Sequence, residues 1–359
     1  MNIVSVVNLI DTVQRASIAV SPRQQVPILT CVLMEFSGDK LKISGTNIET
    51  AIVTSCNCTV ENEFSIAVNA HKLLNIAKSL PKDKFVDFKL NKLSLSLSCS
   101  GSKFNMPIIS ADEFPPVPRI PCNDFDFEGS TTVKELINTL RSVSHAQSSD
   151  ATRYIFNATF LDFGDNLKAV ATDGRRLAFC QLDHKFPEST CVLPEKTVGM
   201  LMSYTDQLEV IIKKSKRMIM FEFDSDDILW SKLVEGTYPK WQDVYKPSDV
   251  DPISLNADQL KRQVSRAAIM TSDRNLSVTI TASNNKLTLN SEDVSFGAVV
   301  TSMDCKYQGP EVSVSINPVY LIDILSQCKD EITLLIKDNI EPVYINSGNL
   351  NSMIMPLRN

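Results

Sequence analysis

The amino-acid sequence predicts an α+β protein made of three copies of one domain. A short helical segment opens each third of the 359-residue chain, at 8–20, 132–145 and 256–270. A second helical segment follows an apolar strand in each third, at 65–78, 191–202 and 314–325. Corresponding segments lie about 125 residues apart, which is the length of one ordinary domain. Such a repeat determines the architecture, and we expect about two helices packed on one side of antiparallel sheet in each copy.

The opening helical segments carry both a core-facing stripe and a start signal. Apolar residues recur at helical spacing in the first and third of them, at Leu9, Val13 and Ala16 and at Leu260, Val264 and Ala267. These stripes predict the buried face of each helix. Residues that commonly cap the start of a helix stand at the expected places, at Asn8, Thr132 and Asn256.

Strands account for most of the remaining residues. Polar and apolar residues alternate most clearly at 40–45, 92–99, 217–223 and 286–290. A period of two predicts a sheet with one buried and one exposed face. Turn-forming residues separate consecutive strands at Asn91, 164–166 and 283–285.

Two proline-containing stretches divide the copies. Segment 114–121 holds four prolines and can join neither a helix nor a central strand. Segment 238–247 is its counterpart about 125 residues later, and we interpret both as linkers. The predicted domains are therefore 1–120, 121–245 and 246–359.

Composition points to a cytoplasmic protein. No apolar run approaches the roughly 20 residues that span a bilayer, and the N-terminus lacks the features of a secretory signal. We expect the nine cysteines to be reduced and mostly buried. Cys56 and Cys58 form the one close pair, and we interpret them as residues on alternate faces of a strand rather than as metal ligands. The net charge of −6 argues weakly against a nucleic-acid partner, but binding depends on how the charge is distributed.

The helical segments are more basic than the rest of the chain. They hold about nine basic residues against about five acidic ones, a balance of about +4 within an acidic protein. The basic residues are Arg15, Lys72, Lys78, Lys134, Arg141, Lys196, Lys261, Arg262 and Arg266. Such charges can simply solvate an exposed helix face. Helices of the same sign at equivalent places in three domains instead favour contact with the phosphates of a nucleic-acid duplex.

Catalytic patterns are missing from the sequence. It contains no phosphate-binding glycine loop, no H-E-x-x-H pattern and no nucleophile elbow. The most polar compact cluster is 172–176, in which Asp173 and Arg176 could act in a nuclease; a tight turn before a strand explains the cluster as well. We expect no enzyme, no cofactor and no metal.

Six segments carry a resemblance to a known family. They are 27–29 followed by 44–49, 110–118 (SADEFPPVP), 171–178 (ATDGRRLA), 231–239 (SKLVEGTYP) and 355–358 (MPLR). Together they resemble the bacterial DNA sliding clamps, the beta subunits of DNA polymerase III. The resemblance covers the whole chain, including its length and its threefold repeat.

The resemblance implies a ring. Two chains would join head to tail, with antiparallel sheets outside and the helices of six clamp domains lining a hole for double-stranded DNA of any sequence. The implied function is that of a processivity factor in DNA replication, which tethers the polymerase catalytic subunit, the clamp loader and repair proteins through short peptide motifs. A non-replicative scaffold with the same ring fold is the alternative.

The resemblance also implies site residues. A hydrophobic pocket for partner peptides would be formed by Phe156, Thr172, Gly174, Arg175, Arg176, Leu177, Pro239, Val244, Ile340, Pro342, Val343, Met353, Ile354, Met355, Pro356, Leu357 and Arg358. Three residues, Arg175, Asp243 and Asn359, depart from the usual pattern of the family. These differences bear on which partner peptides the pocket would prefer.

Two further sets of residues complete the expected sites. For DNA, the resemblance points to Arg23, Lys78, Arg153 and Lys196, and the charge argument adds Arg141, Lys261, Arg262 and Arg266. By position, Phe104 and Met106 would meet Ile269 and Met270 of a second copy; packing within the core of their own domain is the alternative for each.

Overall fold

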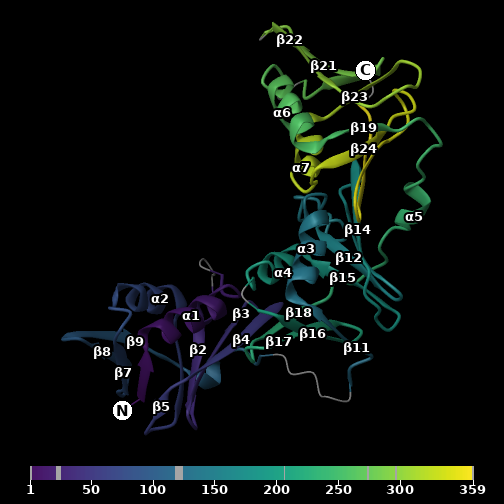
Figure 1. Ribbon diagram of the computed structural model, residues 1–359. Helices are drawn as coiled ribbons and strands as arrows, with labels where there is room; N and C mark the ends of the chain where they lie inside the picture. The colour runs from purple at the N-terminus through teal and green to yellow at the C-terminus, as the bar shows by residue number, and fades with distance from the viewer. Residues whose placement is uncertain are drawn as a thin grey trace. The chain divides into compact units, whose positions relative to one another are not determined.

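The computed structural model describes residues 2–21, 26–117, 124–205, 207–272, 275–295 and 297–357. The described part confirms the α+β class, with four antiparallel sheets and two helices in each third of the chain. Two compact units are present: Met1–Val133 with Gly199–Leu233, and Lys134–Val198 with Val234–Asn359. Figure 1 shows the elements of each unit.

The first unit contains two sheets and two helices, α1 (Val6–Ser17) and α2 (Ala70–Ser79). A five-stranded sheet has the order β5 (Thr59–Val60), β1 (Asn2–Ser5), β7 (Phe85–Leu90), β8 (Ser94–Cys99) and β9 (Ser102–Pro107). A nine-stranded sheet has the order β10 (Ile109–Ser110), β6 (Phe64–Asn69), β2 (Cys31–Ser37), β3 (Lys40–Thr46), β4 (Thr50–Asn57), β18 (Ile228–Lys232), β17 (Met218–Phe223), β16 (Glu209–Lys214) and β11 (Phe127–Thr132).

The second unit repeats this arrangement with helices α6 (Ala257–Ala268) and α7 (Pro318–Leu325). Its eight-stranded sheet has the order β15 (Ser189–Pro194), β12 (Ala158–Phe163), β13 (Leu167–Thr172), β14 (Arg176–Leu182), β26 (Leu350–Ile354), β25 (Val343–Ser347), β24 (Glu331–Leu335) and β19 (Ile253–Asn256). Its four-stranded sheet has the order β22 (Gly297–Asp304), β21 (Lys286–Asp293), β20 (Val278–Ser283) and β23 (Val312–Ile316).

The remaining helices belong to the central third of the chain and to its second linker. They are α3 (Val133–Ser144), α4 (Glu195–Leu201) and the single turn α5 (Trp241–Val244). Two 3-10 turns, η1 (Pro27–Thr30) and η2 (Ala111–Glu113), complete the described elements of the first third.

Each large sheet crosses a predicted domain boundary. In the first unit β4 pairs with β18, with Ala51 opposite Trp230. In the second unit β14 pairs with β26, with Leu177 opposite Met353. Strand pairing between neighbouring domains therefore hides edges that would otherwise remain open. The boundaries predicted at 120 and 245 stay predictions, since the two compact units cut across the middle third.

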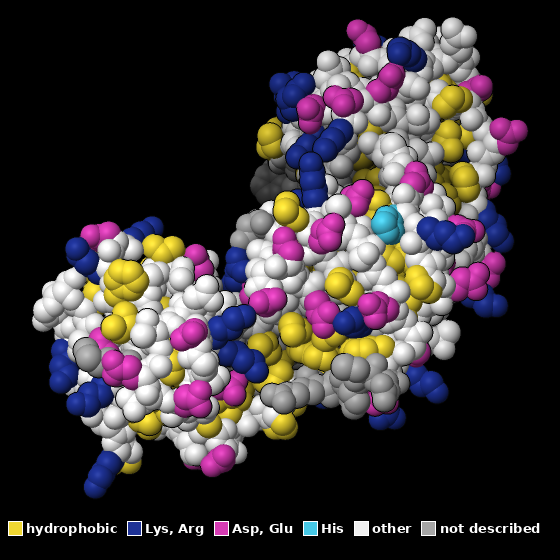
Figure 2. Space-filling view, turned by 60° about the horizontal axis from the view of Figure 1, so that its bottom comes forward, with side chains coloured by type: hydrophobic (Ala, Val, Ile, Leu, Met, Phe, Trp, Pro, Cys, Tyr) yellow, Lys and Arg dark blue, Asp and Glu magenta, His cyan; other side chains and the backbone are white. Residues whose placement is uncertain are grey.

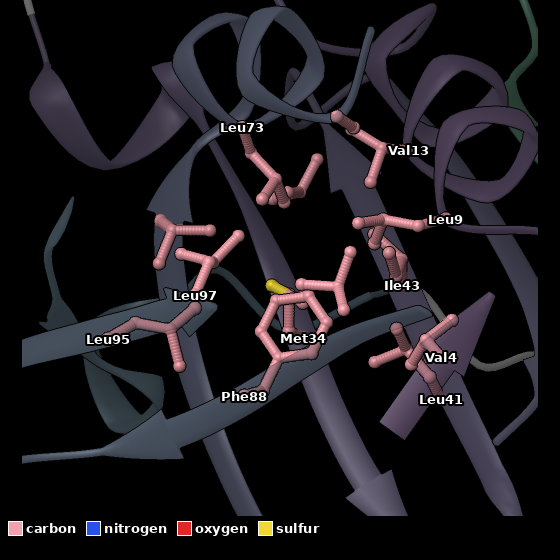
Figure 3. Packing of buried hydrophobic residues seen from close by; sticks show 14 of the residues in the cluster. Val4, Leu9, Val13, Met34, Leu41, Ile43, Leu73, Phe88, Leu95 and Leu97 are labelled. Atoms are coloured by element: carbon pink, nitrogen blue, oxygen red, sulfur yellow. The ribbon is translucent and has the colours of Figure 1, made fainter. Parts of the chain in front are cut away.

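A hydrophobic core of the first unit lies beneath its two helices. Leu9 and Val13 of α1 and Leu73 of α2 point toward Met34 of β2 and Phe88 of β7 (Figure 3), and all five side chains are buried. The helical stripe predicted for α1 is thus confirmed. Gly45 of β3 allows the close approach of α1, because a Cβ atom there would lie 2.1 Å from the carbonyl oxygen of Ala16.

Local signals agree with the structure at most positions. Asn256 caps α6 by accepting from the N–H of Gln259 at 3.0 Å, as predicted. The prediction for Asn8 is wrong: α1 begins earlier, and Ser5 accepts from the N–H of Asn8 at 3.1 Å. The turn between β20 and β21 holds Asn284 and Asn285 at φ of 49° and 60°, which is the left-handed conformation that a tight hairpin requires.

The described cysteines are free thiols, and most of them are buried. The prediction that Cys56 and Cys58 lie on alternate faces of a strand is wrong. They are two residues apart, and both pack partly against the core beneath α1 and α2. Burial raises the pKa of Cys58 to about 11. No helix among the described residues is both long enough and apolar enough to cross a membrane.

Candidate functional site

The turn between β13 and β14 is held rigidly by its own polar side chains. The Asp173 carboxylate accepts from the backbone N–H groups of Arg175 and Arg176 at 2.8 and 3.0 Å. The Thr172 hydroxyl donates to the carbonyl of Arg176 at 2.6 Å and accepts from the N–H of Gly174 at 3.1 Å. Gly174 has φ of +87°, a conformation that favours glycine. Asp173 therefore stabilises the turn, which removes the main support for the nuclease alternative.

Arg176 lies almost buried at the end of this turn. Its guanidinium donates to Asp173 at 3.1 Å and to Asp323 at 2.6 Å, and it stacks on the ring of Tyr320 at 4.4 Å. The predicted pocket residues did not include Tyr320 or Asp323. Their spacing of three residues on α7 places both on one helix face. Nothing in the sequence indicates that this face meets β14.

Arg153 lies with the predicted pocket residues. Its guanidinium stacks on the ring of Phe156 at 4.5 Å and donates to the carbonyl of Asp173 at 2.9 Å. Arg153 was predicted to contact DNA, whereas the structure brings it to the turn that contains Gly174. Arg175, in the same turn, is exposed.

The C-terminal strand extends along this site. Arg176 stands opposite Ile354, Leu177 stands opposite Met353, and the N–H of Met355 donates to the carbonyl of Arg175 at 2.8 Å. Leu177, Met353 and Ile354 are buried, as is Val343 on the neighbouring β25. These four predicted pocket residues therefore lie beneath the surface. Met355 is the exposed apolar residue at the end of the strand.

The linker 238–247 covers one face of the same sheet with aromatic rings. Tyr238 stacks on Phe160 at 5.1 Å between ring centroids, and Trp241 contacts Phe179 at 4.8 Å. Burial raises the pKa values of Tyr238 and Tyr245, that of Tyr245 to about 12. The predicted residues Pro239 and Val244 lie on this anchored linker, and Val244 is 52% exposed. The anchoring role of these aromatic residues was not predicted from the sequence, although the sequence shows their spacing.

Two of the remaining predicted residues line a groove beside β23. Its volume is about 920 Å³, and Ile340 and Leu357 line it together with β23 and the turn after β24. Ile340 is 67% exposed. Pro342 precedes β25 and is partly buried, and Pro356 precedes Leu357. Arg358 lies outside the described residues.

Exposed cations mark helices in all three thirds of the chain. Lys78 on α2, Arg141 on α3, Lys196 on α4, and Arg262 and Arg266 on α6 are exposed. Within the described ranges, no carboxylate lies at ion-pair distance from any of these five. Lys261 is half-buried, and Arg23 lies outside the described residues.

One of the nine basic residues of the helical segments, Arg15, is neutralised by an ion pair. The guanidinium of Arg15 lies 2.6 Å from the buried carboxylate of Asp227, so Arg15 adds no free charge to its helix. Acidic and basic side chains are mixed over the face that Figure 2 shows.

Edge strands bear two of the residues expected at a subunit contact. β9 ends the five-stranded sheet and β22 ends the four-stranded sheet. Phe104 on β9 is half-buried, whereas Met106 is 4% exposed and belongs to the core of its own domain. For Met106 the core alternative is therefore correct. Ile269, just after α6, is 72% exposed, and Met270 is half-buried.

Comparisons with known proteins agree across the whole chain. Family models of the DNA polymerase III beta subunit match residues 2–118 (N-terminal domain), 130–240 (central domain) and 247–358 (C-terminal domain). The beta sliding clamp of Proteus mirabilis is 26% identical over 98% of this chain and 97% of the relative. That of Pseudomonas aeruginosa is 25% identical over the same shares.

Solved structures of sliding clamps also match the whole chain. A crystal structure of the DNA polymerase sliding clamp from Pseudomonas aeruginosa with ligand matches with a TM-score of 0.94 at 25% identity, over 100% of both chains. A sliding clamp from the same organism bound to griselimycin matches with a TM-score of 0.95 at 25% identity, also over 100% of both chains. With three successive domains matched in sequence and fold, the chain belongs to the DNA polymerase III beta subunit family, the bacterial sliding clamps, which are non-catalytic processivity factors of DNA replication.

Proposed function

We propose that this sliding clamp acts as a closed ring of two chains joined head to tail around double-stranded DNA. The observation that carries the proposal is the repeat, on a helix of each domain, of exposed cations with no ion-pair partner in the described part of the chain, at Lys78, Arg141, Lys196, Arg262 and Arg266. Cations that contact only phosphates hold a duplex without reading its sequence, and the ring is then free to slide. A head-to-tail contact closes only when the rotation between subunits completes a circle.

The edges of β9 and β22 support the subunit contact. Each strand pairs on one side only within the described chain, and an open edge of this length tends to pair with another chain. Phe104 and the exposed Ile269 are the apolar residues that we place at the contact, with Met270 beside it. We keep the domain boundaries at 120 and 245, which the family matches support.

Partner proteins would bind through short peptides at the surface formed by Phe156, the turn 172–177, the linker residues Pro239 and Val244, and the strand end 353–356. Support comes from the exposed apolar side chains of Val244 and Met355 near a rigid turn and an anchored linker. Methionine adapts to several ligands. We add Arg153 to this site and withdraw it from the DNA set, because its guanidinium is engaged by Phe156 and Asp173. The partners would be the polymerase catalytic subunit, the clamp loader and repair proteins, in the cytoplasm.

A retention experiment tests the ring. The clamp is loaded on nicked circular DNA and on the same DNA made linear, and both samples are passed through a sizing column. A ring should stay on the circle and slide off the linear ends. Equal retention on the two forms would contradict encirclement, and monomer alone in light scattering across micromolar concentrations would contradict the dimer.

A further inference from the structure

The second linker ends in a clip made by two tyrosines. The hydroxyl of Tyr245, on the linker, donates to the side-chain oxygen of Asn346 on β25 at 3.0 Å. In return, the hydroxyl of Tyr344 on β25 donates to the backbone carbonyl of Lys246 at 2.8 Å. The two rings meet edge to face, with their centroids 5.1 Å apart. We call Tyr245, Tyr344 and Asn346 the linker clip, because the linker and the strand each donate one hydrogen bond to the other.

Strand register places the clip on the same face of the eight-stranded sheet as part of the predicted pocket. Met353 of β26 stands opposite Leu177 on one side and opposite Tyr344 on the other. Residues directly opposite one another on neighbouring strands share a face of the sheet. Tyr344 therefore lies on the face that carries the pocket residues Leu177 and Met353. The ring of Tyr245 covers the same face, since it packs against Phe179, two residues after Leu177.

The clip holds one end of the single turn α5. The other end is held by Trp241, whose ring contacts Phe179 at 4.8 Å, while Tyr245 contacts the same ring at 4.9 Å. The N–H of Tyr245 donates to the carbonyl of Trp241 at 2.9 Å, which closes the turn. A turn this short is not stable by itself, because fixing its backbone costs more than one hydrogen bond returns. The exposed Val244 therefore takes its position from the side chains that anchor the two ends of α5.

Both hydroxyl groups of the clip remain protonated and able to donate at neutral pH. Burial raises the pKa of Tyr245 to about 12, and it also raises the pKa of Tyr344. Breaking the bond of a shielded hydroxyl costs free energy, because water does not fully replace the lost partner. The chain is fastened again one residue beyond the linker, where the hydroxyl of Ser248 donates to Glu341 at 2.6 Å. Opening this end of the linker therefore breaks several side-chain hydrogen bonds at once.

A preformed turn favours binding of a ligand that contacts it. A peptide that meets an ordered linker loses none of its binding free energy to ordering that linker. Where the turn is ordered only part of the time, the apparent affinity falls in proportion to the ordered fraction.

We propose that Tyr245, Tyr344 and Asn346 are positioning residues of the partner-peptide site, which hold α5 and Val244 in the binding conformation before the peptide arrives. The inference rests on the proposed function, because it requires a peptide that contacts Val244. The clip acts through α5 rather than through a contact of its own with the peptide.

Removing the two hydroxyl groups tests the clip while keeping both rings. The full chain carrying Tyr245→Phe and Tyr344→Phe together, the double variant, is titrated by fluorescence anisotropy with a labelled peptide that has the C-terminal sequence of the polymerase catalytic subunit. Its affinity should fall about tenfold, somewhat less than the full effect of two neutral hydrogen bonds. Tyr307→Phe is the matched control, because it removes a tyrosine hydroxyl that donates to the carbonyl of Pro310 at 2.7 Å outside the linker. An unchanged affinity in the double variant, or an equal loss in Tyr307→Phe, would overturn the proposal.

Hydrogen exchange separates positioning from a general loss of stability. In the double variant, the backbone N–H at position 245, which closes α5, should exchange faster, while β14 and β26 keep their wild-type rates. Saturating peptide should restore the protection of this N–H. Unchanged exchange at position 245, or faster exchange throughout the sheet, would contradict the clip as the device that orders the turn.

Variants of Asn346 provide a rescue and a thermodynamic cycle. Asn346→Asp keeps an oxygen that accepts from Tyr245 and should bind the peptide with wild-type affinity. Asn346→Leu removes the acceptor and should weaken binding about fivefold. In a Tyr245→Phe background, Asn346→Leu should have no further effect, because the bond is already absent. Equal losses in the two Asn346 variants, or the same effect of Asn346→Leu in both backgrounds, would refute the clip.

Val244→Asp distinguishes failure of the clip from failure of the pocket. Weaker peptide binding in Val244→Asp, with normal binding in the double variant, would leave the pocket in place and overturn the clip. Normal binding in Val244→Asp would overturn both, since the clip acts through Val244. Loss of binding in both, with Tyr307→Phe unaffected, supports both.

Discussion

The guanidinium of Arg176 donates to the carboxylate of Asp323 over 2.6 Å, which joins strand β14 of the central third to helix α7 of the last third. Asp173 and the ring of Tyr320 enclose the same guanidinium. Arg176 is nearly buried, and its charge is therefore compensated on two sides. This contact holds the turn of the pocket proposed for partner peptides in place, because the turn that contains Gly174 ends at Arg176.

Asp323→Asn should reduce the free energy of unfolding by about 1 kcal/mol, since it replaces one of the two carboxylates that compensate a largely buried cation with a neutral amide. The estimate is modest because Asp323 is itself partly exposed. Urea denaturation provides the measurement. Lys185→Ala is the control, because the pair of Lys185 with Asp165 is exposed on both sides and should contribute well under 1 kcal/mol. Equal losses in the two variants would contradict a special role for Arg176.

Gly45→Ala should destabilise the protein by about 2 kcal/mol, because the new Cβ would meet the backbone of α1 at a distance that no packing change absorbs. Thermal or urea unfolding measures the loss. Gly164→Ala is the matched control, since nothing lies within 4 Å of its Cβ position. A neutral effect at position 45 would show that α1 moves away from β3 easily.

The stability of the protein should fall as the pH drops from about 6.5 toward 4. Both ring nitrogens of His145 are shielded from water. Desolvation, and next the charge of Arg176, lower the pKa of His145 to about 4 from an ordinary 6.5. In this window the unfolded chain binds more protons than the folded one, so stability is lost on acidification, by up to about 3 kcal/mol. Urea midpoints measured across the window should fall less in His145→Leu than in the wild type. Parallel curves would contradict a buried neutral histidine.

Lys196→Ala and Arg266→Ala should each weaken binding of a short duplex without changing any sequence preference. Each phosphate contact removed should lower the slope of log affinity against log salt by about 0.9. Anisotropy titrations at several salt concentrations measure the slope. Lys185→Ala removes an exposed cation that is paired with Asp165, and it should leave the slope unchanged. Equal salt slopes in the control and in the two helix variants would contradict the assignment of Lys196 and Arg266 to the DNA contact.

Val244→Asp should reduce binding of the C-terminal peptide of the polymerase catalytic subunit at least tenfold, because it places a charge on the exposed apolar part of the linker. Surface plasmon resonance measures the affinity, and light scattering checks that the oligomeric state is unchanged. The exposed residue Gln242 on the same short helix offers the control Gln242→Ala. Unchanged affinity in Val244→Asp would move the pocket elsewhere.

Short-range signals were predicted well because they depend on neighbours in the chain. The stripe Leu9, Val13 and Ala16 faces the core as the helical period requires, and the turn at Asn284 and Asn285 follows from their tolerance of positive φ. The cap at Asn8 was wrong because Ser5, three residues earlier, offered an equally good acceptor. Local chemistry alone does not choose between two such residues.

The sequence by itself determined the threefold repeat, the α+β class, the basic helices and the membership of the clamp family, since each is written in periodicity or in contiguous motifs. Only the tertiary structure decided which residues share a surface. It joined β14 to β26 and Arg153 to Phe156, buried Met106 in its own core, and neutralised Arg15 with Asp227. The physical reason is that strand pairing and ion pairs act between residues as many as 212 positions apart, where no local pattern records which partner is chosen.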